Sequence, residues 1–64
     1  MKRTKLIKHL TQNGCVLLRE GKKHSIFYNP LAGKISAIPR HPNIKQFTAE
    51  KICKDLEVTF PTGK

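Results

Sequence analysis

The sequence predicts a small α+β domain in which three antiparallel strands lie between two helices along the chain. Two segments, 2–14 and 48–56, carry apolar residues at the spacing of an amphipathic helix. Short apolar runs bounded by glycine, asparagine or proline lie between them, a pattern typical of adjacent strands. A chain of this size buries only about 60% of its unfolded surface, so a single thin core is expected.

The first helix is predicted from an apolar face followed by a stop signal. Leu6, Ile7 and Leu10 recur at helical spacing, and the intervening positions are mostly polar. Asn13 and Gly14 follow, and glycine readily adopts the left-handed conformation found just past the end of a helix. We therefore expect the helix to end at this dipeptide.

Three strand candidates follow and are joined by short turns. The first run is apolar and the second is rich in β-branched and aromatic residues, while the third alternates until Pro39 ends it. Short connections join antiparallel neighbours, so we expect a meander in chain order. The expected strands are residues 15–20, 24–28 and 34–38.

The second helix is expected to begin at Thr48 after a loop over residues 39–47. Threonine is a favourable N-cap residue, and Glu50 then falls in the first turn, where the helix dipole favours a negative charge. Phe47 precedes this cap and Ile52 follows it by four positions, the spacing of a hydrophobic staple. The sequence thus predicts that Phe47 packs against Ile52.

The two helices need a shared apolar surface, and one face of the three-stranded antiparallel sheet supplies it. The resulting α-β-β-β-α order is that of the double-stranded-RNA-binding domain, in a very compact form. We expect residues 1–58 to form this single domain and residues 59–64 to form a C-terminal tail, with Phe60 still able to pack.

The charge of the chain indicates a polyanionic partner. Thirteen Lys and Arg residues stand against four Asp and Glu residues, which gives a formal charge of +9 and an isoelectric point near 10.1. Such a field attracts nucleic acid, or alternatively an acidic protein. The chain lacks a signal-peptide pattern and a membrane-length apolar run, so a cytoplasmic protein without membrane contact is expected.

The cysteines predict neither a metal site nor a disulfide framework. Cys15 and Cys53 stand far apart in apolar stretches, and their spacing with the histidines matches no metal-binding pattern. We expect both to be reduced, buried thiols. The chain is also too short to enclose a large cofactor, so no cofactor and no metal are expected.

His24 is the strongest candidate for chemistry. It follows the turn Gly21-Lys22-Lys23, so two ammonium groups are placed close to an imidazole that exchanges protons near neutral pH. RNA carries its own nucleophile, the 2′-hydroxyl, and needs a base to deprotonate it and cations to stabilise the developing phosphate charge. Local chemistry alone favours the other interpretation, a surface histidine without a catalytic role in a basic protein.

Several motifs in order give the chain a resemblance to HicA-type (YcfA-like) toxins. The short helix ends at Asn13-Gly14, and a histidine follows the glycine turn as Gly21-Lys22-Lys23-His24. The third strand leads into a Pro-x-His element, Pro39-Arg40-His41, and a polar loop precedes a final helix led by threonine. The resemblance covers residues 4–58, nearly the whole chain.

The resemblance implies a metal-independent endoribonuclease of a toxin–antitoxin system that cleaves messenger RNA. It implies His24 as the catalytic residue, and it implies an acidic HicB-like antitoxin as the protein partner. Lys22, Lys23, Arg40 and His41 are the candidate phosphate-binding residues. His41 has two further interpretations, a second acid–base group or a structural residue in a loop stiffened by Pro39 and Pro42, and its local setting favours the structural one.

Two other functions stay open at this level. One is a non-catalytic module that binds double-stranded RNA, and the other is a basic protein that engages only an acidic protein. Tyr28 also has two interpretations: it stacks on an RNA base if its sheet face is open, or it belongs to the half-buried core. His9, beside the apolar face of the first helix, is expected to be structural.

Overall fold

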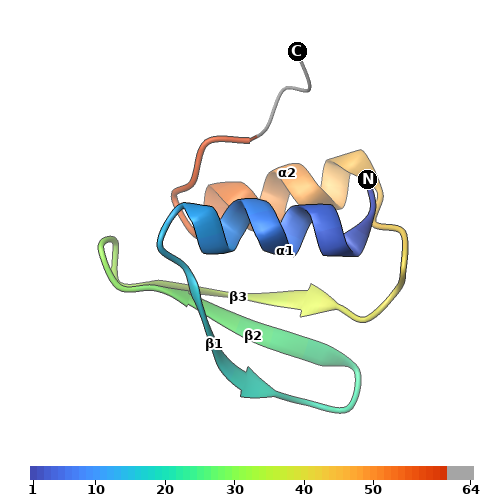
Figure 1. Cartoon of the computed structure of the whole chain (residues 1–64), viewed down its shortest axis with the longest axis horizontal. Coiled ribbons are helices and arrows are strands. Elements are labelled where there is room, and N and C mark those ends of the chain that lie inside the picture. Colours follow the sequence, from blue (N-terminus) through green and yellow to red (C-terminus); the bar gives the residue numbers. More distant parts are fainter. Residues whose placement is uncertain (61–64) are drawn as a thin grey trace.

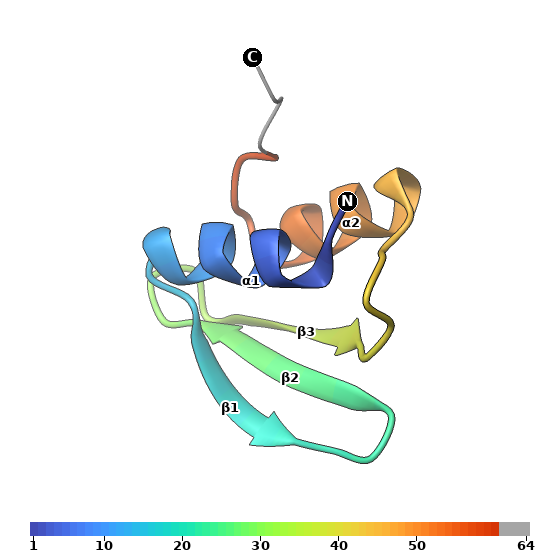
Figure 2. The same cartoon turned by 45° about the vertical axis from the view of Figure 1, so that its right-hand side comes forward.

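The computed structural model describes residues 1–60 and shows the predicted order of elements (Figure 1). The helices are α1 (Arg3–Gln12) and α2 (Gln46–Asp55), and the strands are β1 (Val16–Glu20), β2 (His24–Asn29) and β3 (Lys34–Pro39). The strands form one antiparallel sheet in the order β1-β2-β3. Both helices lie on the same face of this sheet (Figures 1 and 2), so the predicted fold class is confirmed.

The core fills the space between the two helices and strands β2 and β3. Helix α1 contributes Leu6 and Leu10, both fully buried, as its apolar pattern predicted. Gly14 follows the helix with a φ of +89°, which confirms the predicted left-handed stop. The other buried apolar residues are Cys15, Phe27, Ile38, Ile44, Ala49, Ile52, Cys53, Leu56 and Val58.

Helix α2 begins two residues earlier than the sequence indicates. Its first helical residue is Gln46 and its N-cap is Lys45, which makes no side-chain capping bond. The predicted Thr48 N-cap is therefore wrong, because Thr48 already lies within the first turn. Glu50 falls in the second turn, where its carboxylate accepts a 2.9 Å hydrogen bond from Gln46 Nε2. This i,i+4 pair stabilises the start of the helix instead of a cap.

The predicted staple between Phe47 and Ile52 is also wrong. Phe47 lies on the outer side of α2 and is 78% exposed, whereas Ile52 is buried in the core. Because the helix starts earlier, Phe47 lies on the side away from the sheet. Another pair of residues occupies the staple positions. Ile44, directly before the N-cap, and Ala49 in the next turn are both buried. They occupy the two positions that define a hydrophobic staple.

The N-terminus fixes the loop that precedes α2. Met1 N donates to the carbonyl of Ile44 at 2.9 Å, and Ile44 N donates back to the Met1 carbonyl at 2.7 Å. Arg3 N donates to the Pro42 carbonyl at 2.9 Å. Residues 1–3 therefore pair with residues 42–44 much as a short strand would, and the loop is held against the start of α1.

Strand β1 is left uncovered by both helices. All five of its residues are exposed, and the apolar side chains of Val16, Leu17 and Leu18 are 49%, 52% and 57% exposed. A β-bulge lies between Leu17 and Arg19, where the pairing with β2 shifts. The extra residue bends this edge strand and increases its twist. Figure 2 shows β1 as the strand farthest from the helices.

The beginning of the expected tail packs against the domain. Val58 is buried, Phe60 packs against the core, and His9 Nε2 lies 2.6 Å from the Thr59 carbonyl oxygen. His9 thus links α1 to the segment after α2, in agreement with the structural role expected for it. Residues 61–64 of the expected tail lie outside the described residues.

Candidate functional site

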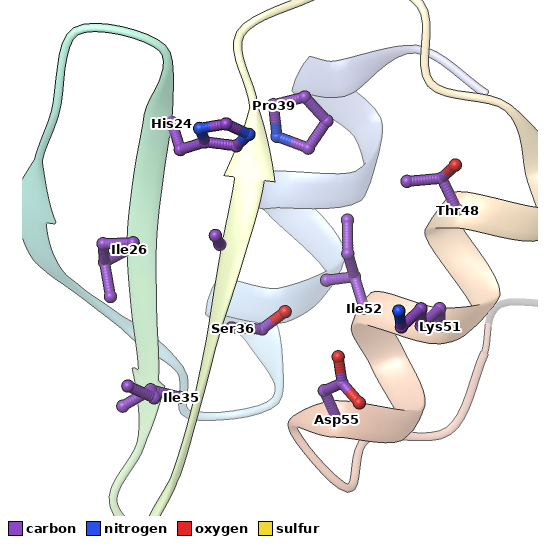
Figure 3. Close-up of a pocket in the computed structure, with 10 residues that line it drawn as sticks. His24, Ile26, Ile35, Ser36, Pro39, Thr48, Lys51, Ile52 and Asp55 are labelled. Atoms are coloured by element: carbon purple, nitrogen blue, oxygen red, sulfur yellow. The ribbon is translucent and has the colours of Figure 1, made fainter.

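His24 begins β2 and exposes its side chain on the sheet face opposite the helices. Burial alternates along β2: Ser25 and Phe27 are buried beneath the helices, whereas Ile26 shares the open face with His24. Pro39, at the end of β3, is the direct cross-strand partner of His24. Figure 3 shows the imidazole extending from the start of β2 toward the Pro39 ring. The imidazole is therefore accessible to a ligand.

A backbone hydrogen bond to His24 holds the turn that precedes this residue. Gly21 N donates to the His24 carbonyl at 2.8 Å, which closes the turn around Lys22 and Lys23. A Cβ on Gly21 would lie 3.0 Å from that same carbonyl oxygen, so only glycine fits without displacing it. Arg40 N donates to the Lys23 carbonyl at 3.3 Å and joins this turn to the end of β3.

The structure brings all the predicted site residues together. Between the β1–β2 turn and the residues after β3 lies a surface hollow of about 400 Å³, which we call the basic hollow. Its lining consists of Lys22, Lys23, His24, Pro39, Arg40 and His41. Cations from two separate segments therefore surround an exposed imidazole. Such a surface is suited to hold a phosphodiester next to a group that transfers protons.

Arg40 has a carboxylate partner that the sequence did not reveal. Its Nη2 lies 2.6 Å from Glu20 Oε2, and the two side chains are 44% and 49% exposed. An exposed pair of this kind contributes little to stability, about 0–1 kcal/mol. The carboxylate instead competes with any incoming phosphate for the same guanidinium. Glu20 therefore moderates the positive charge of the basic hollow.

Arg3 is a second residue that the sequence analysis missed, and it binds the strands of the site from the helix side of the sheet. Its Nε donates to the Pro39 carbonyl at 2.9 Å and its Nη2 donates to Ser25 Oγ at 2.6 Å. These bonds connect the end of β3 with the residue that follows His24. No local signal in the sequence indicates this role, because both partners lie more than twenty residues away along the chain. Only the packing of α1 across the sheet brings them together.

His41 is exposed in the loop that pairs with the N-terminus. Besides the basic hollow, it lines a neighbouring depression with Pro42, Ile44 and Lys45. The bonds of residues 42–44 to residues 1–3 fix the loop in addition to the predicted effect of its prolines. His41 is thus held on the same surface as His24, while its role stays a prediction.

A third depression leads away from His24 along the edge of the sheet. It has a volume of about 540 Å³ and lies between β3 and α2 (Figure 3). His24, Ile26, Ile35 and Pro39 line it from the sheet, together with Ser36 and Ala37, and Thr48, Lys51, Ile52 and Asp55 line it from α2. Its sheet side is mainly apolar, so the surface changes from charged to apolar on moving away from the basic hollow.

The two cysteines lie away from this surface. Cys15 and Cys53 are free and buried in the core. Burial raises the pKa of both thiols, and the proximity of Cys15 raises the pKa of Cys53 further. Within residues 1–60, no cluster of three or more His, Cys, Asp or Glu side chains is placed to hold a metal ion. No helix in the described part has the length and apolar character to cross a bilayer.

Comparison with protein families adds a finding that covers most of the chain. Residues 3–58 match the family described as the HicA toxin of bacterial toxin-antitoxin. The chain belongs to the HicA toxin family. The match runs from the start of α1 to Val58 and includes every residue that lines the basic hollow of this HicA toxin. No curated protein and no solved structure matches the chain.

Membership in this family places the HicA chain in a toxin–antitoxin system, in which the toxin pairs with an antitoxin. It confirms the resemblance noted in the sequence.

Proposed function

We propose that this HicA toxin is an endoribonuclease that cleaves messenger RNA, with His24 as its catalytic residue. The observation that supports the proposal is the basic hollow, in which an exposed imidazole is surrounded by Lys22, Lys23 and Arg40. The formal charge of +9 supplies the long-range attraction for RNA. The cytoplasm, where messenger RNA is translated, is the proposed location.

The proposed reaction uses a nucleophile that the RNA itself carries. His24 accepts the proton of a ribose 2′-hydroxyl, and the 2′-oxygen attacks the adjacent phosphorus as a new P–O bond forms. The bond from phosphorus to the 5′-oxygen then breaks, that oxygen takes up a proton from solvent, and His24 releases to solvent the proton that it accepted. The products are a 2′,3′-cyclic phosphate and a free 5′-hydroxyl, so no metal-bound water is required as the nucleophile.

The cations of the basic hollow act on the phosphate. Lys22 and Lys23 are assigned to the non-bridging oxygens, where negative charge builds up in the transition state. Arg40 exchanges Glu20 for phosphate as RNA binds, and its planar guanidinium is suited to two parallel hydrogen bonds. His41, beside Arg40, is assigned to the same phosphate or its neighbour. An acidic HicB-like antitoxin is the proposed partner, because it would neutralise this surface.

Substitution of His24 by alanine tests the proposal. His24→Ala is expected to reduce cleavage of an RNA oligonucleotide by about 10²–10⁴-fold, the usual contribution of a general acid or base. RNA affinity measured by anisotropy should stay within a few-fold of wild type. His9→Ala is the matched control, because it removes a histidine outside the basic hollow and should retain cleavage. Wild-type cleavage by His24→Ala would refute the assignment, and an absence of cleavage by every variant would indicate a binding module.

A further inference from the structure

The open face of the sheet continues the surface of the basic hollow with apolar side chains. His24, Ile26 and Tyr28 alternate along β2 on this face. The register places Tyr28 between Val16 of β1 and Ile35 of β3, which are 49% and 57% exposed. Tyr28 itself is partly exposed. Tyr28 therefore lies on the uncovered face of the sheet, which is the condition that stacking on a base requires.

The chemistry of this face favours a nucleic acid base over a purely apolar ligand. Its residues, by register, are Val16, Arg19, His24, Ile26, Tyr28, Ile35, Ala37 and Pro39. None of them is acidic, and a cationic and an imidazole side chain accompany the aliphatic ones. An aromatic ring with aliphatic neighbours in a positive field is the arrangement on which single-stranded nucleic acid bases stack.

The distance along β2 fits an extended RNA strand. Tyr28 follows His24 by four residues, which corresponds to roughly 13 Å along a β-strand. A nucleotide adds six backbone bonds where an amino acid adds three, so an extended RNA strand advances about twice as far per residue. A phosphodiester at His24 therefore places a base about two nucleotides away over Tyr28.

We infer that Tyr28 forms a base-stacking subsite, and that this toxin binds single-stranded RNA across the open face of its sheet. A paired base cannot offer its ring face to a protein side chain, so duplex RNA is excluded from this subsite. The inference rests on the proposed function in one respect, since the position of the base is counted from the linkage that His24 would cleave. Binding itself does not require cleavage.

Tyr28 can be observed directly, because it is the only tyrosine and the chain has no tryptophan. The tyrosine fluorescence of His24→Ala is titrated with a single-stranded RNA hexanucleotide, which this variant should leave intact. We expect saturable quenching as a base stacks on the ring. In a series of hexanucleotides with one abasic residue moved along the strand, a single position should lose both the quenching and the affinity.

Substitutions in the His24→Ala background complete the test. Tyr28→Ala should weaken RNA binding by roughly 5- to 150-fold, the range that corresponds to truncation of a stacking aromatic, whereas Tyr28→Phe should bind as before. Phe47→Ala is the matched control, because it removes an exposed aromatic from the outer side of α2 and should leave the affinity unchanged. A duplex of the same sequence should bind more weakly than the single strand.

Two results would overturn the inference. One is RNA binding without quenching, together with wild-type affinity of Tyr28→Ala, which would leave the face to a protein partner. The other is equal affinity for single strand and duplex. Failure of the proposed nuclease activity gives a different pattern, because wild type would then bind and quench without cleaving. If wild type cleaves every hexanucleotide of the abasic series equally well, the nuclease proposal holds and the stacking subsite does not.

Discussion

The Arg3 guanidinium donates a 2.6 Å hydrogen bond to Ser25 Oγ, directly beside the candidate catalytic residue His24. Ser25 is 1% exposed, and the second bond of Arg3 reaches the carbonyl of Pro39, the cross-strand partner of His24. A residue at the start of α1 thus fixes both strands at the point where the basic hollow is formed. The position of the imidazole depends on a contact between distant parts of the chain.

Arg3→Met is expected to lower the free energy of unfolding by about 1–3 kcal/mol, because the buried Ser25 hydroxyl and the Pro39 carbonyl lose their partner. Arg3→Lys keeps the charge but not the two-pronged geometry, so it should restore little. Urea unfolding and RNA cleavage are measured together. Lys5→Met, which removes a charge from an exposed site on the same helix, should stay within about 0.5 kcal/mol of wild type. Wild-type stability of Arg3→Met would contradict this role.

Glu20→Gln is expected to strengthen RNA binding, because it releases Arg40 from its 2.6 Å ion pair. The His24→Ala background prevents cleavage during the measurement. Affinity should rise several-fold and should depend more steeply on salt, by a log–log slope of about 0.7 if one phosphate contact is gained. Stability should change by less than about 1 kcal/mol, since the pair is exposed.

The control for this experiment is the second ion pair of the described residues, in which Lys34 Nζ lies 4.0 Å from Glu57 Oε2. Glu57→Gln makes the same change in net charge outside the basic hollow. An equal gain in RNA affinity for both variants would show that net charge, and not release of Arg40, is responsible.

Gly21→Ala is expected to reduce cleavage more than its effect on stability would suggest. The new methyl group meets the His24 carbonyl oxygen at 3.0 Å, and this backbone atom can move only by shifting the start of β2. Gly14→Ala is the matched control: it is strained by a φ of +89° but meets no atom within 4 Å. It should cost about 1 kcal/mol in unfolding free energy and leave the cleavage rate unchanged. Equal losses of activity in both variants would argue against the contact.

The buried thiols predict a dependence of stability on alkaline pH. Because burial raises the pKa of Cys15 and Cys53, the folded chain holds their protons more tightly than the unfolded chain. Their contribution to stability is complete below the pKa of an unfolded thiol, about 8.5, and declines as the pH rises above it. The free energy of unfolding in urea should therefore fall with rising pH more steeply for wild type than for Cys15→Ala/Cys53→Ala. Rapid reaction of the folded chain with a thiol reagent at neutral pH would contradict their burial.

The order of the elements could be predicted because periodicity and turn residues are local signals. Leu6 and Leu10 marked the buried face of α1, and Gly14 marked its end. The start of α2 could not be predicted in the same way. The fit of Thr48 to an N-cap is a local signal, but the pairing of Ile44 with Met1 fixes the chain before that point and overrides it. A contact across 43 residues cannot be inferred from local propensity.

In the candidate site, too, residues marked by local signals could be predicted, and residues that act through distant contacts could not. His24 and the lysines beside it were visible as consecutive residues, and the resemblance to HicA toxins added Arg40 and His41. Arg3 and Glu20 were not identified, because the partners through which they act are distant in sequence. Basic and acidic side chains are common on surfaces, so their residue type alone carries no signal. The sheet face on which His24 lies could not be predicted, because this requires knowing which side of the sheet the helices cover.

The bare edge formed by β1 has a consequence for how this molecule behaves in solution. Val16, Leu17 and Leu18 present an apolar strand with unpaired backbone groups, a surface on which copies of a chain can join edge to edge. The +9 charge of each copy opposes such association through mutual repulsion. Salt shortens the range of that repulsion, from about 10 Å at 0.1 M to 3 Å at 1 M. High salt, which would also weaken the proposed binding of RNA, is therefore expected to promote association between copies of the chain.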